Sequence, residues 1–236
     1  MSSRLASFKG PSTPTASPVQ AQKRGGGSAP NSPSRPVSNE TTYHRQVRAA
    51  LQELQAVAQT WDELVLMDGL KAVQMLVDSR TELENALASV PGRKPWTHLV
   101  GTKIEDMERC IVDLDVLSGK LRKQFSKMNA IVDALEGVLQ NAHKIKGWQW
   151  VSQEPLWLTW SLEKFVTEIP DLLVVYHRSL DEHADMIWRL RSHSISFEDS
   201  RTIVSEWTSQ TALEEDGWDA RWNDLCAVEV ERWGRR

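Results

Sequence analysis

The sequence has very little cysteine and no long hydrophobic run. Among its 236 residues only Cys110 and Cys226 are cysteines, which excludes a disulfide scaffold and a multi-cysteine zinc site and fits a reducing compartment. No apolar stretch approaches the ~18–20 residues of a membrane-spanning helix, and the N-terminus lacks the apolar core of a secretory signal. We therefore expect an intracellular protein, nuclear or cytoplasmic, that is neither secreted nor membrane-spanning.

Motifs of catalysis and metal binding are also missing. The six histidines form no i, i+4 pair, and neither the H-E-x-x-H helix of zinc proteases nor the Glu-x-x-His of di-iron bundles occurs. The glycine patterns of nucleotide-binding loops and the nucleophile elbow of hydrolases are absent too. We therefore predict a protein that is not an enzyme and has no catalytic residues, metal site or cofactor. We interpret His177 and Asp181 as a surface pair and Cys110 as inert packing.

Charge and proline are unevenly distributed along the chain. Residues 1–40 hold six of the ten prolines and a run of three glycines, and their five basic residues and one acid give a net charge of +4. The remaining 23 basic and 31 acidic residues give −8. A segment with so little apolar surface cannot offset its ordering entropy. We predict a disordered, basic, Ser/Pro-rich tail over residues 1–40.

The tail contains three Ser/Thr-Pro dipeptides, which begin at Thr13, Ser17 and Ser32. Arg35 follows Ser32 at the position where cyclin-dependent kinases favour a basic residue. Each phosphate would add about −1.5 to −2 charge, so two or three would cancel or reverse the tail's charge and release it from an acidic partner. We predict phosphorylation at these three residues; chance is the alternative, because Ser, Thr and Pro are abundant here.

The rest of the chain is predicted to be all-α. Three proline-poor segments with helical periodicity, near residues 41–90, 102–146 and 155–193, predict an elongated antiparallel bundle of three long, coiled-coil-like helices over residues 41–193. Residues 194–236 are expected to add two short, Trp-rich helices packed on the bundle end.

Local signals set the expected boundaries of these helices. Asp68-Gly69 predicts an interruption in the first long helix, and Gly147 predicts the end of the second. Pro155 suits the first turn of the third helix, and Pro170 predicts a kink within it. Ser196 with Asp199 resembles a capping box and predicts a short helix over residues 197–210.

The second long helix carries the clearest heptad pattern. Its a and d positions run from Ile104 to Ala142 over nearly six heptads, and eleven of the twelve are apolar. A 3-4 spacing kept for so long predicts packing along the whole helix. The twelve positions are Ile104, Met107, Ile111, Leu114, Ser118, Leu121, Phe125, Met128, Val132, Leu135, Leu139 and Ala142.

Eleven tryptophans are far more than a chain of this length usually holds. One interpretation is that these rings cap the end of the bundle, with their indole N–H groups hydrogen bonded. The other is a partner surface, since Trp is enriched at binding hot spots. Stacking on single-stranded nucleic acid is disfavoured by the acidic C-terminal setting. The predicted partner surface comprises Trp148, Trp150, Trp157, Trp160, Trp218, Trp222, Leu225 and Trp233.

One stretch resembles a known family. Pro155-Leu156-Trp157-Leu158-Thr159-Trp160, followed by Phe165, Glu168, Leu172-Leu173, Tyr176, Leu180 and Trp207, is similar to the C-terminal half of the cyclin-dependent-kinase-interacting protein family. The resemblance covers roughly residues 102–213, and His177 stands where that family would have Arg. It implies a non-catalytic nuclear adaptor in DNA replication, genome maintenance or a larger ATPase assembly, with a cyclin-dependent kinase or that assembly as partner.

These observations predict a non-catalytic helical adaptor or subunit of a larger assembly. Its partners are expected to be other helical or coiled-coil proteins, in a hetero-complex or a homodimer. Alternatives are a coiled-coil subunit of a cytoskeletal, chromosome-attachment or vesicle-tethering complex, and a BAR-like dimer that binds curved membranes. The acidic body disfavours the BAR-like alternative, because such modules need a basic face.

Overall fold

The computed structural model describes residues 40–89, 97–192, 194–214, 217–231 and 233, without the side chains of 97–99, 218, 219 and 221. Residues 40–236 form one compact unit. Within the described residues all regular secondary structure is helical, with one isolated β-bridge between Pro155 and Ser161. The all-α prediction is confirmed. The predicted tail, with Thr13, Ser17 and Ser32, lies outside the described residues except for Glu40.

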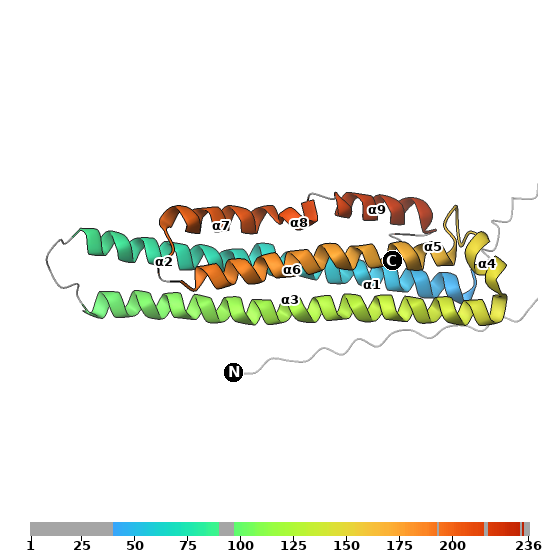
Figure 1. The fold of residues 1–236 in the computed structure, drawn as a ribbon, viewed down its shortest axis with the longest axis horizontal. Helices are drawn as coiled ribbons and strands as arrows, with labels where there is room; N and C mark the ends of the chain where they lie inside the picture. Colours follow the sequence, from blue (N-terminus) through green and yellow to red (C-terminus); the bar gives the residue numbers. More distant parts are fainter. Residues whose placement is uncertain (1–39, 90–96, 193, 215–216, 232, 234–236) are drawn as a thin grey trace, which may run out of the picture. The chain divides into compact units, whose positions relative to one another are not determined.

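The longest elements pack side by side (Figure 1). Helix α1 (Thr42–Glu63) continues through a π-helical segment, η1 (Leu64–Gly69), into α2 (Leu70–Ala88). Helix α3 (Thr97–Lys146) has 50 residues, about 75 Å at 1.5 Å per residue. It contacts α1, α2 and α6 (Pro170–Leu190). None of the described helices is both long and apolar enough to pass through a bilayer.

Five shorter helices complete the described fold. Helices α4 (Trp148–Gln153) and α5 (Leu162–Glu168) connect α3 to α6. Helices α7 (Phe197–Ser209), α8 (Thr211–Glu214) and α9 (Trp218–Glu229) follow one another in a row (Figure 1). Helix α7 contacts α2 and α6, and α8 contacts α6 and α9.

The heptad positions of α3 form much of the core. Eight of the twelve are buried, with Leu114, Leu121 and Met128 fully enclosed. Ser118, Phe125 and Leu139 are half-buried, and Ile104 is exposed. Additional buried positions such as Cys110 and Leu117 widen the stripe, because α3 has neighbours on two sides. The pattern therefore predicted the buried face of α3 but not its width.

Several predicted boundaries are confirmed by local geometry. Helix α3 ends at Lys146, and Gly147 follows with φ of +83°, a conformation that favours glycine. Ser196 caps α7 by accepting a hydrogen bond from the Asp199 backbone N–H at 3.0 Å. Pro170 begins α6 at its first turn, so the predicted kink is a junction between α5 and α6.

The prediction that the third long helix begins at Pro155 is wrong. Residues 154–161 form a closed turn in which the Leu156 N–H donates to the Trp160 carbonyl at 2.8 Å. The helix begins only after Ser161, whose hydroxyl accepts from the Lys164 N–H at 3.3 Å. The N-cap preference of Ser161 and the packing of the turn override the helix-start signal of the proline.

The predicted interruption at Asp68-Gly69 takes the form of the π-helical segment η1 rather than a break. Gly69 is buried, and a Cβ on it would lie 2.6 Å from the Trp207 ring and 2.7 Å from Leu117. The Trp207 indole Nε1 donates to the Val65 carbonyl at 3.0 Å. The absent side chain of Gly69 therefore lets α7 approach the junction of α1 and α2 closely.

A buried arginine holds the corner between α6 and α7. Arg80 of α2 is only 4% exposed, and its guanidinium donates to the carbonyls of Leu190 at 3.0 Å and Ser192 at 3.2 Å. It also donates to the Ser200 hydroxyl at 3.2 Å. Carbonyls at the C-terminal end of a helix lack intrahelical partners and favour a cation. Arg80 therefore ties the end of α6 and the start of α7 to α2.

The close approach at Gly69 gives a testable expectation. Gly69→Ala should lower the free energy of unfolding by about 1–3 kcal/mol, because the new methyl group overpacks a filled site. Urea unfolding measures the change. Gly119→Ala is the matched control: its Cβ meets nothing within 4 Å, and alanine's better helix propensity should stabilise α3 by up to about 1 kcal/mol. Equal effects of the two changes would contradict the packing at Gly69.

Candidate functional site

The turn over residues 154–161 is held by a carboxylate from the C-terminal part of the chain. Glu229, at the end of α9, is only 7% exposed. Its carboxylate accepts from the backbone N–H groups of Thr159 at 2.9 Å and Trp160 at 3.1 Å, and from the Thr159 hydroxyl. These three hydrogen bonds hold the turn against the end of α9.

These hydrogen bonds change the acidity of Glu229. Burial alone would raise the pKa of this carboxyl group, but the hydrogen bonds from Thr159 and Trp160 outweigh burial. With help from the nearby charge of Lys164, they hold the pKa of Glu229 below its ordinary value. The buried carboxylate therefore stays ionised at neutral pH and joins two distant segments.

Aromatic rings cluster around this turn. Trp157 packs edge-on against His44 and Phe165, with ring centroids 5.3 and 5.7 Å apart. The Arg48 guanidinium lies 5.5 Å from the centroid of the Trp157 ring and is paired with Glu40. The His44 Nε2 atom is hydrogen bonded to the Leu156 carbonyl. The start of α1 thus packs against residues 154–161. We give the name bundle-end cluster to Glu40, His44, Arg48, Leu156, Trp157, Trp160 and Phe165.

Two more tryptophans extend the aromatic packing. Trp160 lies 5.2 Å from Phe165, and the Lys164 ammonium group lies 4.4 Å from the centroid of the Trp160 ring. Trp150 packs 5.5 Å from Tyr43. Such ring contacts and cation–π contacts each contribute about 0.5–1.5 kcal/mol. The inner side of the cluster is therefore packed, and its contacts stabilise the fold.

Three large apolar side chains in segments near this cluster are exposed. Ile145 at the end of α3 is 68% exposed, Trp148 of α4 is 56% exposed and Leu158 of the turn is 61% exposed. All three belong to segments that meet at the end of the molecule where α3 gives way to α4 (Figure 1). We call them the apolar rim. Large apolar side chains gathered at one end are typical of a surface that another protein covers.

The predicted partner residues fall into distinct environments. Trp148 is exposed, whereas Trp150, Trp157 and Trp160 are half-buried against the core. Trp222 is buried, and Leu225 and Trp233 are half-buried. Trp218 begins α9, and its side chain lies outside the described atoms. The structure thus brings Trp148, Trp150, Trp157 and Trp160 to one end of the molecule.

The residues considered for chemistry are accounted for by packing and surface pairing. The His177 Nδ1 lies 3.1 Å from the Asp181 carboxylate, both side chains being exposed, as a surface pair should be. Cys110 and Cys226 are buried, and burial raises the pKa of both thiols, that of Cys226 to about 12. No group of three or more potential metal ligands occurs in the described part of the chain.

Two features escaped sequence reasoning. Glu229 was not singled out, because it binds a turn about 70 residues earlier in the chain. Trp188 of α6 was not singled out either, although at 71% it is the most exposed large hydrophobic side chain among the described residues. A signal for Trp188 was present: it lies off the stripe Leu180–Ala184–Ile187 on the same helix, so a helical projection places it outside the core.

Neither a protein-family model nor a curated protein matches this chain.

The role of Glu229 can be tested through its pH dependence. At pH 7, Glu229→Gln should lower the free energy of unfolding by about 1–3 kcal/mol, because two backbone N–H groups lose a charged acceptor. A lowered folded-state pKa means that the carboxylate's contribution is complete above the ordinary pKa and is lost as the pH falls through the folded value. The difference between the two proteins should therefore shrink in that acidic range, as urea unfolding at stepped pH will measure.

Glu136→Gln is the control, since Glu136 is exposed on α3 and engages in none of these bonds. Its effect should stay within about 0.5 kcal/mol at every pH. A Glu229→Gln effect that is independent of pH would show that the carboxylate charge does not matter.

Proposed function

We propose that the protein is a non-catalytic helical adaptor, or a subunit of a larger protein assembly, built on an antiparallel bundle of three long helical segments. The observation that supports this function is the apolar rim of Ile145, Trp148 and Leu158, more than half exposed beside a rigidly packed aromatic cluster. A rigid surface loses little conformational entropy when a partner covers it.

The rim has the anatomy of a binding hot spot. Its tryptophan and aliphatic side chains are exposed, while Trp157 and Trp160, which flank Leu158 in the sequence, are half-buried against the core. Hot spots on proteins are enriched in tryptophan and supported by well-packed neighbours. A partner that offers an apolar helix or groove fits this surface, in keeping with expected helical or coiled-coil partners.

The biological setting rests on the family resemblance alone. The residues that carry it include Trp157, Trp160 and Phe165 of the bundle-end cluster, together with Tyr176 and Trp207 of the core. We therefore propose a cell-cycle, DNA-replication or genome-maintenance assembly as the setting, with a cyclin-dependent kinase or an ATPase assembly as the partner.

The adaptor function can be tested by partner capture. The tagged full chain should recover stoichiometric partners from its native cell, and Trp148→Glu with Leu158→Glu should reduce that recovery at least about tenfold, because two charges would be buried in the contact. Quantitative mass spectrometry measures the recovery.

Met67→Glu is the control for this double change. Met67 lies in η1 and is 69% exposed, so it tests the effect of a charge on an exposed apolar residue elsewhere. It should leave the partners in place. Recovery of the chain alone, or partners indifferent to the rim changes, would refute the proposed function of this surface.

A further inference from the structure

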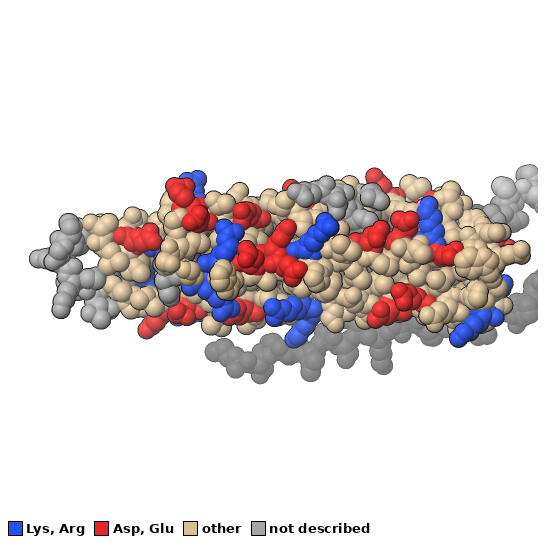
Figure 2. Space-filling model, viewed as in Figure 1, with Lys and Arg blue, Asp and Glu red and all other residues tan. Residues whose placement is uncertain are grey.

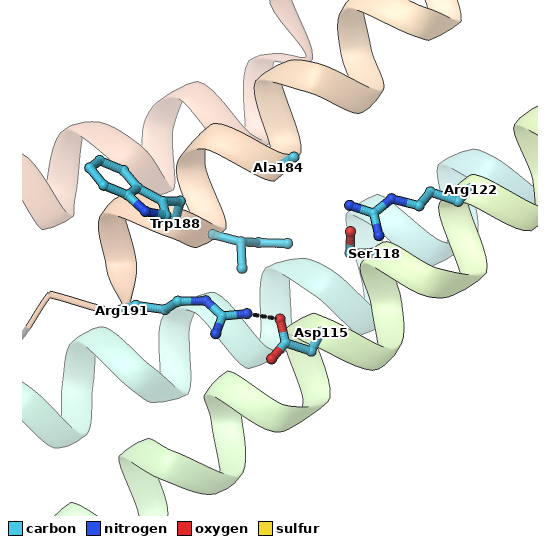
Figure 3. A pocket seen from close by; sticks show the side chains of 7 residues that line it. Asp115, Ser118, Arg122, Ala184, Trp188 and Arg191 are labelled. Atoms are coloured by element: carbon cyan, nitrogen blue, oxygen red, sulfur yellow. Dashed lines mark hydrogen bonds and ion pairs between the residues drawn. The ribbon is translucent and has the colours of Figure 1, made fainter.

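A groove between α3 and α6 lies beside the exposed Trp188. It has a volume of about 590 Å³, which is the size of a typical ligand cleft. Ala184, Ile187 and Trp188 of α6 supply its apolar part, and Ser118 and Arg122 of α3 line the other side (Figure 3). Arg191 crosses its end to pair with Asp115.

Trp188 does not fill this groove. Its side chain points away from Ser118 and Arg122 in Figure 3 and is 71% exposed. A tryptophan side chain can bury roughly 150–250 Å², so most of that apolar surface is left in water. Trp188 therefore both forms one wall of a partly apolar groove and projects from its edge into solvent.

Charges flank the projection and the hollow with opposite signs. On α6, Asp181 and Asp185 precede Trp188 by seven and three residues, so all three share one helix face. Both carboxylates are exposed; Asp181 lies 3.1 Å from the His177 Nδ1 and Asp185 lies 3.9 Å from the Arg189 guanidinium. At the groove the cations are Arg122 and Arg191. Among the described residues Arg122 has no ion-pair partner, whereas Arg191 has Asp115. Figure 2 shows basic and acidic side chains close together on this face.

We propose that a second copy of the chain covers this face, with Trp188 of each copy inserted into the α3–α6 groove of the other. A two-fold axis beside Trp188 places the same surface on both sides of the contact, as an isologous dimer requires. This arrangement brings the carboxylates that precede each Trp188, and Asp185 in particular, toward the unpaired Arg122 of the other copy. The exposed indole, the groove and the charges of both signs all lie within one chain, which favours a second copy over an unrelated partner.

The dimer is tested with the purified full chain by sedimentation equilibrium over about a hundredfold range of concentration. We expect the mean mass to rise from 26.8 kDa toward twice that value. Trp188→Ala should weaken the association by about thirtyfold, as expected for a hot-spot tryptophan. Met67→Ala, on the similarly exposed Met67 of η1, should leave it unchanged.

A charge exchange tests the orientation. Arg122→Glu should weaken the dimer by about tenfold, because it places like charges opposite each other, whereas Lys123→Glu, one residue along α3, should not. Adding Asp185→Arg to Arg122→Glu should restore the association. Far-ultraviolet circular dichroism and the melting temperature confirm that each variant is folded.

Three results would overturn the dimer. They are a mass of 26.8 kDa at every concentration, an association that Trp188→Ala leaves intact, or a double variant no tighter than Arg122→Glu alone. These outcomes are independent of partner capture through the apolar rim, so either proposal can fail without the other.

Discussion

The hydrogen bond from the Trp207 indole to the Val65 carbonyl connects α7 to the π-helical junction of α1 and α2 at 3.0 Å. Both residues are fully buried, and a buried polar group that loses its partner costs about 1–3 kcal/mol. The bond requires Gly69 to have no side chain, because the indole occupies the space of a Cβ. His183 of α6 packs edge-on against the same indole at 4.7 Å. The placement of α6, α7 and the α1–α2 junction therefore depends on one ring.

Two further polar contacts join distant parts of the chain. Arg80 binds the end of α6 and the start of α7, and Glu229 binds the turn before α5. Burial lowers the pKa of the Arg80 guanidinium, opposed by the charge of Glu84. Apolar heptad seams tolerate a slip of one turn, whereas these hydrogen bonds form in one register only. We infer that burial provides the stability of the bundle and that Trp207, Arg80 and Glu229 select its register.

Periodicity and local helix-end signals predicted the features that depend on neighbours in the sequence. The buried stripe of α3, the end of that helix at Gly147 and the Ser196 cap of α7 follow from residues within a few positions of one another. The turn over residues 154–161 was misread as the start of a helix, because the carboxylate of Glu229 and the His44 ring packed on Trp157 come from far along the chain. Local signals cannot report such contacts.

At the candidate site, the tryptophans show the same difference between what the sequence predicts and what distant contacts decide. Their number predicted aromatic packing or a partner surface, and both environments occur: Trp61, Trp207 and Trp222 are buried, whereas Trp148 and Trp188 are exposed. Composition cannot separate these cases. Only the register of each residue on its helix, together with the neighbours of that helix, decides whether a ring packs inside or faces solvent.

Trp148 and Trp188, the exposed tryptophans in the described part of the chain, lie on different helices, α4 and α6, with different surroundings. A dimer through Trp188 would therefore leave the apolar rim around Trp148 uncovered on each copy. Two rims on one dimer would let a partner with two matching sites bind the second site at high effective concentration. Where the geometry permits both contacts, such bivalent binding raises avidity by roughly 10²–10⁴ without a new contact. An adaptor of this design would discriminate between partners by the spacing of their sites as well as by their surface chemistry.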